Sequence, residues 1–156
     1  MRNVTLCFLF KGNQVLLAMK KRGFGANRWN GYGGKLNEGE SLEDAAIREL
    51  HEESGLKVRK DALKKISEID FLFVKKPEWD QCVHTFFVNE WEGEPKETEE
   101  MRPQWFDIGA IPYGEMWPED KLWLPRAILG EKIKGKIYFK DLEGNAEKVE
   151  FGEGSF

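Results

Sequence analysis

The chain has 156 residues, of which 40% are apolar and 33% charged, and its formal net charge is −4. These values are typical of one globular domain, 1–156, with a single apolar core. The acidic charge argues against a nucleic-acid polymer as the main ligand, because polyphosphate backbones bind basic surfaces; a small nucleotide carrying Mg²⁺ remains compatible. No apolar run is long enough to cross a bilayer and no secretory leader is recognisable, so we expect no membrane partner.

The cysteines, Cys7 and Cys82, lie inside apolar, strand-like runs. This placement favours core thiols over a disulfide or a metal pair. A reducing, cytoplasmic location is the simplest expectation, with a monomer as the default state.

Apolar and β-branched residues indicate several strands, two of them joined by turn residues at Gly12-Asn13 and two at Gly144-Asn145. In chain order the strand-like stretches cover 3–10, 15–19, 66–74, 83–91, 105–108, 133–140 and 146–151. Strands at both ends with helices between them predict an α+β fold rather than a doubly wound sheet.

Two helices are expected between these strands. Ser41 is a suitable N-cap and Gly55 a left-handed C-cap, so the first helix is predicted over about 42–54. A second helix follows Asp120 and is expected to start late, near Leu122, because Pro125 is tolerated only in a first helical turn.

The first helix has an apolar stripe that becomes acidic halfway along. At about 100° per residue, Glu49, Glu52 and Glu53 continue the arc of the preceding leucine and alanines. Three converging carboxylates repel one another, and Arg48, off to one side, is expected to hold one of them but not three. Oxygen ligands without His or Cys favour Mg²⁺ or Mn²⁺, which share their coordination with substrate phosphates. A solvated acidic face is the alternative interpretation.

The spacing of the charged and glycine residues around this helix is specific. Five residues separate Gly34 from Glu40, and seven more separate Glu40 from the tripeptide Arg48-Glu49-Leu50. After one further residue comes Glu52-Glu53, and after another comes Gly55-Leu56. This pattern, over 34–56, resembles the box of the Nudix hydrolase superfamily without a departure at a defining position. The resemblance implies a mixed central sheet sandwiched between helices, and a loop-helix-loop box that binds divalent metal and cleaves nucleoside diphosphates linked to another group.

The loop before the helix, over 20–35, contains five glycines and five basic residues. Glycines let backbone groups approach a ligand closely, and Lys20 and Lys35 can offset phosphate charge. We therefore expect this loop to contact phosphate or metal.

Segments outside the box resemble, more narrowly, the oxidised-purine nucleoside triphosphate hydrolases, the animal MutT homologues of this superfamily. The similar segments are Met19 to Ala26, Arg28 to Lys35, Glu100 to Phe106 and Met116 to Asp120. The implied substrate-binding residues are Thr5, Lys20, Phe24, Asn30, Tyr32, Gly33, Gly34, Lys35, Phe71, Phe73, Met101, Trp117, Glu119 and Asp120. The implied metal-binding positions are Gly33, Glu49, Glu52, Glu53 and Glu100, and the implied catalytic residues are Glu53, Glu52, Glu100 and Arg48.

These residues predict Mg²⁺-dependent hydrolysis of oxidised purine nucleoside triphosphates, such as 8-oxo-dGTP or 2-hydroxy-dATP, to the monophosphate and pyrophosphate, with Mn²⁺ as a substitute ion. Trp117 is expected to stack on the base, and Glu119 and Asp120 to share a proton while reading its polar edge. Glu53 is the first candidate for the general base and Glu52 or Glu100 the second.

Two positions depart from the narrower resemblance. Glu119 stands where those proteins usually have Asp, and a typical Met has no certain counterpart near Trp79 to Cys82. Other Nudix substrates therefore stay open: a methylated purine triphosphate, ADP-ribose, a dinucleoside polyphosphate or capped RNA. A non-catalytic nucleotide-binding module is a further alternative, and Trp117 to Asp120 would then merely start a helix.

Overall fold

The computed structural model describes all residues, 1–156, as one mixed β-sheet with two α-helices. The strands are β1 (Arg2–Lys11), β2 (Gln14–Lys20), β3 (Trp29–Asn30), β4 (Tyr32–Lys35), β5 (Lys64–Phe73), β6 (Gln81–Val88), β7 (Met101–Asp107), β8 (Ile133–Phe139) and β9 (Ala146–Glu153). The helices are α1 (Leu42–Ser54) and α2 (Asp120–Ile128). The predicted α+β class is confirmed, and neither helix is long and apolar enough to cross a membrane.

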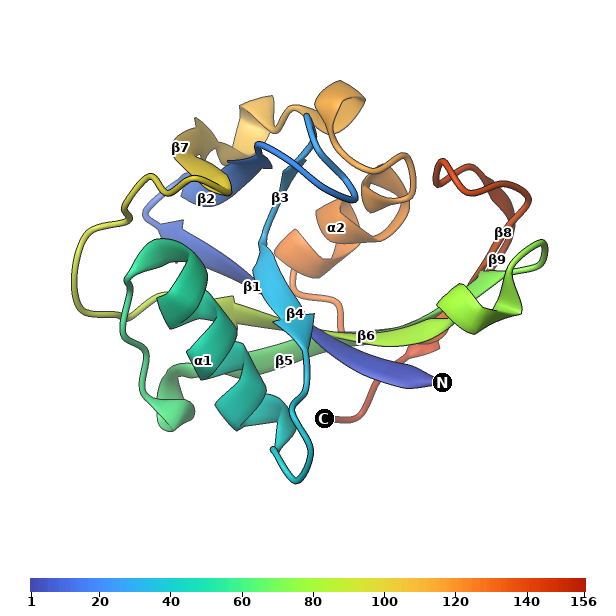
Figure 1. The fold of residues 1–156 in the computed structure, drawn as a ribbon, viewed down its shortest axis with the longest axis horizontal. Helices are drawn as coiled ribbons and strands as arrows, with labels where there is room; N and C mark the ends of the chain where they lie inside the picture. Colours follow the sequence, from blue (N-terminus) through green and yellow to red (C-terminus); the bar gives the residue numbers. More distant parts are fainter.

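Strand β1 organises the sheet, whose main order is β3-β2-β1-β6-β5-β8-β9 (Figure 1). One edge of β1 pairs in parallel with β6. Its other edge pairs with β2 near the C-terminal end and with β4 near the N-terminal end. Strand β7 pairs with the far edge of β2. The short β3 and β4 therefore lie where the box loop meets the centre of the sheet.

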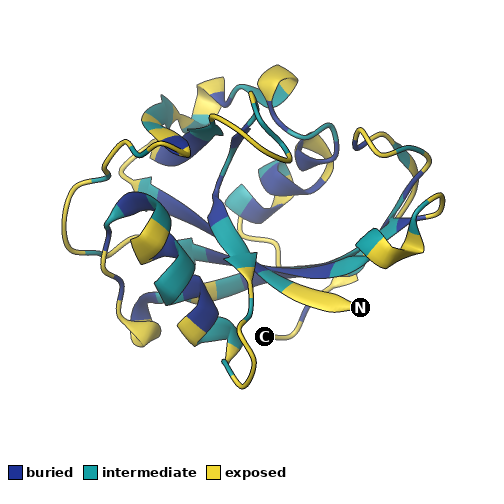
Figure 2. Cartoon of the chain, in the orientation of Figure 1, coloured by how far each residue is buried: buried dark blue, intermediate teal, exposed yellow.

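The two helices cover opposite faces of the sheet. Successive strand residues point to opposite faces. Phe8 belongs to the core cluster that contains Trp123 and Leu124 of α2, whereas the next residue, Leu9, belongs to the cluster that contains Leu50 of α1. The burial pattern in Figure 2 follows this arrangement, with buried residues on the inner sides of both helices. The predicted sandwich of a mixed sheet between helices is confirmed.

Helix α1 begins and ends where its sequence predicts. Ser41 accepts a hydrogen bond from the backbone N–H of Asp44, and Gly55 adopts a left-handed φ of 80°. Helix α2 differs, because it begins at Asp120 and not near Leu122, and Pro125 lies inside it. The proline costs only the hydrogen bond that the carbonyl of exposed Lys121 would otherwise accept, and water can replace it.

The sequence pattern misses strands β3 and β4. Their residues, Trp29 to Lys35, include three glycines, which have low strand propensity. Pairing with β1 and β2 holds them in strand geometry. The remaining predicted strands are present with shifted ends; the 105–108 strand, for example, begins at Met101.

We predict that Ser41→Ala lowers the free energy of unfolding by about 1 kcal/mol, because the first turn of α1 loses its side-chain cap. Chemical denaturation measures this difference, and Ser155→Ala, at an exposed serine near the C-terminus, is the matched control. Equal stabilities for both variants would contradict the capping role.

Candidate active site

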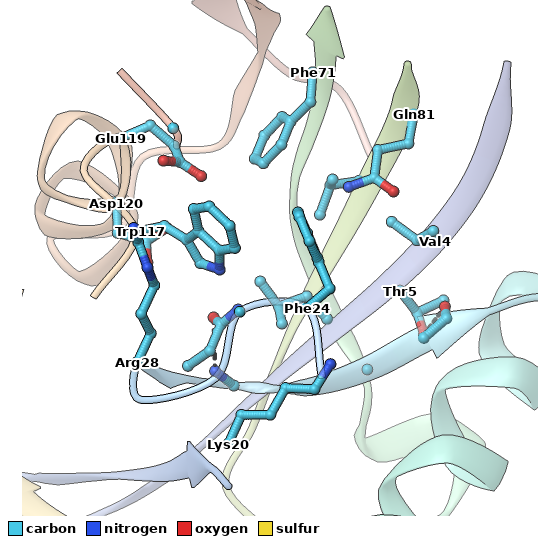
Figure 3. Close-up of a pocket in the computed structure, with 18 of the residues that line it drawn as sticks. Val4, Thr5, Lys20, Phe24, Arg28, Phe71, Gln81, Trp117, Glu119 and Asp120 are labelled. Atoms are coloured by element: carbon cyan, nitrogen blue, oxygen red, sulfur yellow. Dashed lines mark hydrogen bonds between the residues drawn. The ribbon is translucent and has the colours of Figure 1, made fainter. Parts of the chain in front are cut away.

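A cavity of about 310 Å³ opens between the sheet, the loop before β3 and the start of α2. Figure 3 shows Trp117 and Glu119 at one end, Phe71 and Gln81 on the far wall, and Lys20 and Thr5 towards the other end. The predicted substrate-binding residues that line it are Thr5, Lys20, Phe24, Asn30, Gly33, Gly34, Lys35, Phe71, Phe73, Met101, Trp117, Glu119 and Asp120, and Glu53 joins them. Segments far apart in the chain thus meet at one site.

Glu53 of α1 lines the cavity and is tied to the glycine-rich strand β4. The backbone N–H of Gly33 donates to Glu53 Oε1 at 3.0 Å. A Cβ on Gly33 would lie 1.8 Å from the Thr5 carbonyl oxygen, and one on Gly34 would lie 2.6 Å from the Glu49 carboxylate carbon. Glycine at position 33 is therefore required for β4 to pair closely with β1, and glycine at position 34 leaves room for the Glu49 carboxylate of α1.

The charge of Glu53 is poorly compensated. Burial and then the negative charge of Glu49 raise the pKa of Glu53 to about 8, against the lowering effect of the Gly33 hydrogen bond. A carboxylate that is ionised in this place needs a positive charge nearby. This demand is the electrostatic signature expected of a cation-binding residue.

Arg48 contacts three carboxylates, so the expectation that it holds only one is wrong. Its guanidinium binds both oxygens of Glu40 at 2.8 and 2.9 Å, Glu49 at 2.9 Å and Glu52 at 3.3 Å. The Lys35 carbonyl accepts a further hydrogen bond at 3.0 Å. The prediction failed because Nη1 reaches both Glu49 and Glu52 on the same helix, and because Glu40 approaches the other side of the guanidinium from the loop before α1. Hydrogen bonding to Arg48 lowers the pKa of Glu40 to about 2.

The five positions that the resemblance implies for metal binding are only partly brought together. The Glu52 side chain is 58% exposed, and the Glu100 side chain, 57% exposed, forms an ion pair with Arg22 at 3.1 Å. In this arrangement no group of three acidic, His or Cys side chains is close enough to hold a metal ion. The donor chemistry still fits a hard divalent cation, because Glu49 and Glu53 offer only oxygen and the charge of an ionised Glu53 has no ion-pair partner.

Trp117 forms a wall at the opposite end of the cavity and is held from two sides. Phe24, 57% exposed, lies 5.2 Å from it between ring centroids, and the Arg28 guanidinium lies 4.1 Å from its ring. Arg28 also donates to the Glu143 carbonyl in the β8–β9 hairpin at 3.3 Å. The indole is thus contacted by two side chains of the loop before β3, and Arg28 ties that loop to the β8–β9 hairpin.

Glu119 and Asp120 are buried beside Trp117, each 3% exposed. Glu119 Oε2 and Asp120 Oδ2 have no hydrogen-bond partner in the chain. Burial and the neighbouring Asp120 charge raise the pKa of Glu119 well above its usual range, and burial raises the pKa of Asp120 to about 7. A buried acceptor without a hydrogen-bond partner lowers the stability of the fold, so this pair can gain free energy by hydrogen bonding to the polar atoms of a ligand.

The cavity floor is aromatic and apolar. Phe73 stacks on Phe139 with ring centroids 4.7 Å apart, and Phe71 meets the same ring edge-on at 5.4 Å. Met101, the first residue of β7, is buried at the cavity margin. These positions are those that the resemblance implies for a base-binding floor.

Tyr32 is the one implied substrate-binding residue that does not line the cavity. It is fully buried and packs with Leu9, Leu16 and Leu50 in the core under α1. The reason is strand alternation: Gly31 and Gly33 take the cavity side, so the residue between them points to the opposite face. Direct contact between Tyr32 and a ligand is therefore not supported.

Several cavity residues were not assigned a role from the sequence, among them Arg28, Gln81 and Gly144. Gln81 is the residue between Trp79 and Cys82 that faces the cavity. A Cβ on Gly144 would lie 2.8 Å from the Trp117 ring, so the β8–β9 hairpin can approach the cavity only with glycine there. No local pattern could indicate this contact, because Gly144 reads simply as a turn residue.

Comparison with known proteins agrees with this geometry. The sequence matches the NUDIX domain family over residues 1–127. The chain belongs to the Nudix family. Nudix hydrolases generally need a divalent cation, which is consistent with the uncompensated charge of Glu53.

Two relatives are similar over most of the chain. The protein named oxidized purine nucleoside triphosphate hydrolase of Mus musculus is 50% identical over 140 residues, covering 90% of this Nudix chain and 88% of the mouse protein. The protein of the same name of Danio rerio is 51% identical over 137 residues, covering 88% and 85%. The predicted resemblance to this group is confirmed.

A solved structure shows the same fold. The crystal structure of the mutator MutT protein from Bacillus halodurans has a TM-score of 0.83, with 97% of each chain covered and 24% identity. The Nudix fold predicted from the box is therefore confirmed.

We predict that wild-type stability falls as pH rises from about 4 to about 7, because Asp120 and Glu119 keep their protons to higher pH in the folded state. The folded state then binds more protons than the unfolded state across this window. The double variant Glu119→Gln, Asp120→Asn should lose less stability over this window, by on the order of a few kcal/mol, and should retain the loss that the raised pKa of Glu53 causes.

Thermal unfolding at several pH values from 4 to 8 measures the difference between the two proteins. Asp107→Asn, at an exposed site on β7, is the control and should follow the wild type. Parallel pH curves for the wild type and the double variant would contradict the assignment.

Proposed function

We propose that this Nudix hydrolase converts oxidised purine nucleoside triphosphates, such as 8-oxo-dGTP and 2-hydroxy-dATP, into the monophosphate and pyrophosphate, with Mg²⁺ as its cofactor and Mn²⁺ as a substitute. The observation that carries the proposal is one continuous cavity, with an aromatic slot and two unpartnered buried carboxyls at one end and Glu53 at the other. Relatives with about half of the sequence in common carry the corresponding name.

The base is proposed to enter the slot beside Trp117. Stacking on an indole is worth about 1–3 kcal/mol per base and tolerates different purines. Glu119 and Asp120 then read the polar edge, one protonated and donating, the other ionised and accepting. Asn30 lines the same cavity and supplies an amide with both functions.

The phosphates are proposed to extend towards Lys20 and Lys35, which line the cavity near the glycine-rich β4. Their ammonium groups offset phosphate charge in a partly enclosed place. The absence of side chains at Gly33 and Gly34 lets the phosphate chain pass close to the backbone and to Glu53.

A divalent cation would be held by Glu49, Glu52, Glu53 and Glu100 with the Gly33 backbone, and when bound would neutralise leaving-group charge and acidify water. Glu49 and Glu52 would then give up contacts with Arg48, which keeps its bidentate contact with Glu40 in the loop before α1. Arg48 is thus proposed to position the acidic stripe rather than to contact substrate.

Glu53 is proposed as the general base. Its Oε1 is fixed by the Gly33 N–H, which leaves Oε2 to take a proton from the water that attacks phosphorus in line with the leaving pyrophosphate. No His or Cys lines the cavity, so a covalent intermediate on those residue types is not part of the proposal.

We also propose that residues 1–156 act as one domain and as a monomer in the cytoplasm. A single sheet whose two faces carry the two helices supports the first part of this statement.

We predict that 8-oxo-dGTP and 2-hydroxy-dATP have higher kcat/KM values than dGTP, ADP-ribose or a dinucleoside polyphosphate. The shape and polar groups of the aromatic slot are the physical reason. Release of pyrophosphate or phosphate across this panel, with Mg²⁺ present, measures the preference. Efficient cleavage of ADP-ribose alone would overturn the proposed substrate class and leave the Nudix chemistry standing.

We predict that Glu53→Gln lowers kcat by about 10²- to 10⁴-fold, because the amide cannot accept a proton, while the variant still folds and unfolds at a midpoint no lower than that of the wild type. Glu43→Gln, on the first turn of the same helix and outside the cavity, is the matched control. Near wild-type turnover of the Glu53 variant would refute this assignment.

A further inference from the structure

Gln81 is a polar residue of the far cavity wall that the proposed reaction does not use. It is the first residue of β6, and it lies opposite Phe71 of β5 in the antiparallel pairing. Directly opposed residues share one face of a sheet. Both residues line the cavity, and Figure 3 draws no hydrogen bond from the Gln81 amide to the other cavity residues. This carboxamide is available to a ligand.

The backbone around Gln81 is well fixed. Its neighbour Asp80 accepts a hydrogen bond from the Phe73 backbone N–H at 2.7 Å, which ties the start of β6 to the end of β5. On its other side Gln81 pairs with Arg2 of β1. The apolar neighbours Val4 and Val83 line the cavity beside it, so little in the wall competes for its hydrogen bonds.

Gln81 and the two buried carboxyls face the cavity from different sides. Figure 3 shows Glu119 and Gln81 across the cavity from each other, with Phe71 between them. A purine whose six-membered ring meets Glu119 and Asp120 therefore presents its imidazole edge towards Gln81.

Oxidation at C8 changes the hydrogen-bonding groups of that edge. An ordinary purine has an acceptor at N7 and a C–H at C8, whereas an 8-oxopurine has an N7–H donor next to a C8=O acceptor. This edge is a cyclic amide, and a glutamine carboxamide complements it with one acceptor and one donor. Apolar side chains cannot make that distinction.

We propose that Gln81 distinguishes 8-oxopurines from unoxidised purines, its Oε1 accepting from N7–H and its Nε2 donating to the C8 oxygen. The proposal rests on the proposed function in placing a purine base in this cavity. Gln81 then determines specificity from the wall opposite the Glu119–Asp120 pair. Oxidation is then read directly, and the carboxyl pair reads the remaining edge of the base.

Binding of the product nucleotides tests this role without any need for turnover. Calorimetric titration gives Kd values of 8-oxo-dGMP and dGMP for the wild type and Gln81→Met, which keeps the side-chain length and removes both polar groups. We expect the wild type to prefer 8-oxo-dGMP and Gln81→Met to lower that preference by about 10- to 100-fold, the effect of losing a bidentate contact to a base.

Further variants and ligands sharpen the test. Gln104→Met, the same change at an exposed position of β7, should keep the wild-type preference. Gln81→Glu, which can accept from N7–H but not donate to the C8 oxygen, should fall between wild type and Gln81→Met. The pair 8-oxo-dAMP and dAMP should respond by a similar factor, because it shares the oxidised edge and differs at the other.

An unchanged preference in Gln81→Met, or equal weakening of both members of each nucleotide pair, would overturn the role of Gln81. So would a wild type that binds both members of a pair equally. Failure of the wild type to hydrolyse 8-oxo-dGTP while it still binds 8-oxo-dGMP selectively would instead overturn the proposed function and leave this inference standing.

Discussion

The close contact between α1 and β4 is the constraint on which the site depends. Because Gly34 has no side chain, the Glu49 carboxylate lies against the β4 backbone, and the Gly33 N–H fixes one oxygen of Glu53. Strand β4 is in turn paired with β1 at the centre of the sheet. The side of α1 that would ordinarily be apolar and complete the core therefore carries carboxylates next to the cavity. Arg48 forms ion pairs with Glu40 and Glu49 at its outer edge.

The two ends of the cavity both contain acidic groups, but the groups at each end suit a different part of a ligand. At the Glu53 end the charge lacks a counter-ion, which suits a cation and its phosphate ligands. At the Trp117 end Glu119 and Asp120 are buried with free oxygen atoms, which suits a neutral base with donors and acceptors. The aromatic floor between them excludes water and strengthens both interactions. One cavity thus separates recognition of the base from chemistry at phosphorus.

Local signals in the sequence were enough to place α1, its caps and its acidic stripe, because capping and helical periodicity act within a few residues. Strands β3 and β4 escaped, since their pairing is imposed by distant β1 and β2 on a segment of low strand propensity. The same limit applies to side chains. Tyr32 points away from the cavity because successive strand residues alternate between the faces of the sheet. The contact of Arg48 with Glu40 and the approach of Gly144 to Trp117 depend on loops that no local pattern positions. Gln81 needed the β5–β6 register to be placed.

The central claim is that the carboxylates of Glu49 and Glu53, on the side of α1 that faces β4, require a divalent cation. Titration of the wild type with Mn²⁺, followed by calorimetry and by the thermal unfolding midpoint, tests it most directly. We predict saturable binding that raises the unfolding midpoint, and its loss in the double variant Glu49→Gln, Glu53→Gln. A wild type that binds no Mn²⁺, or a double variant that binds it as tightly, would contradict the account.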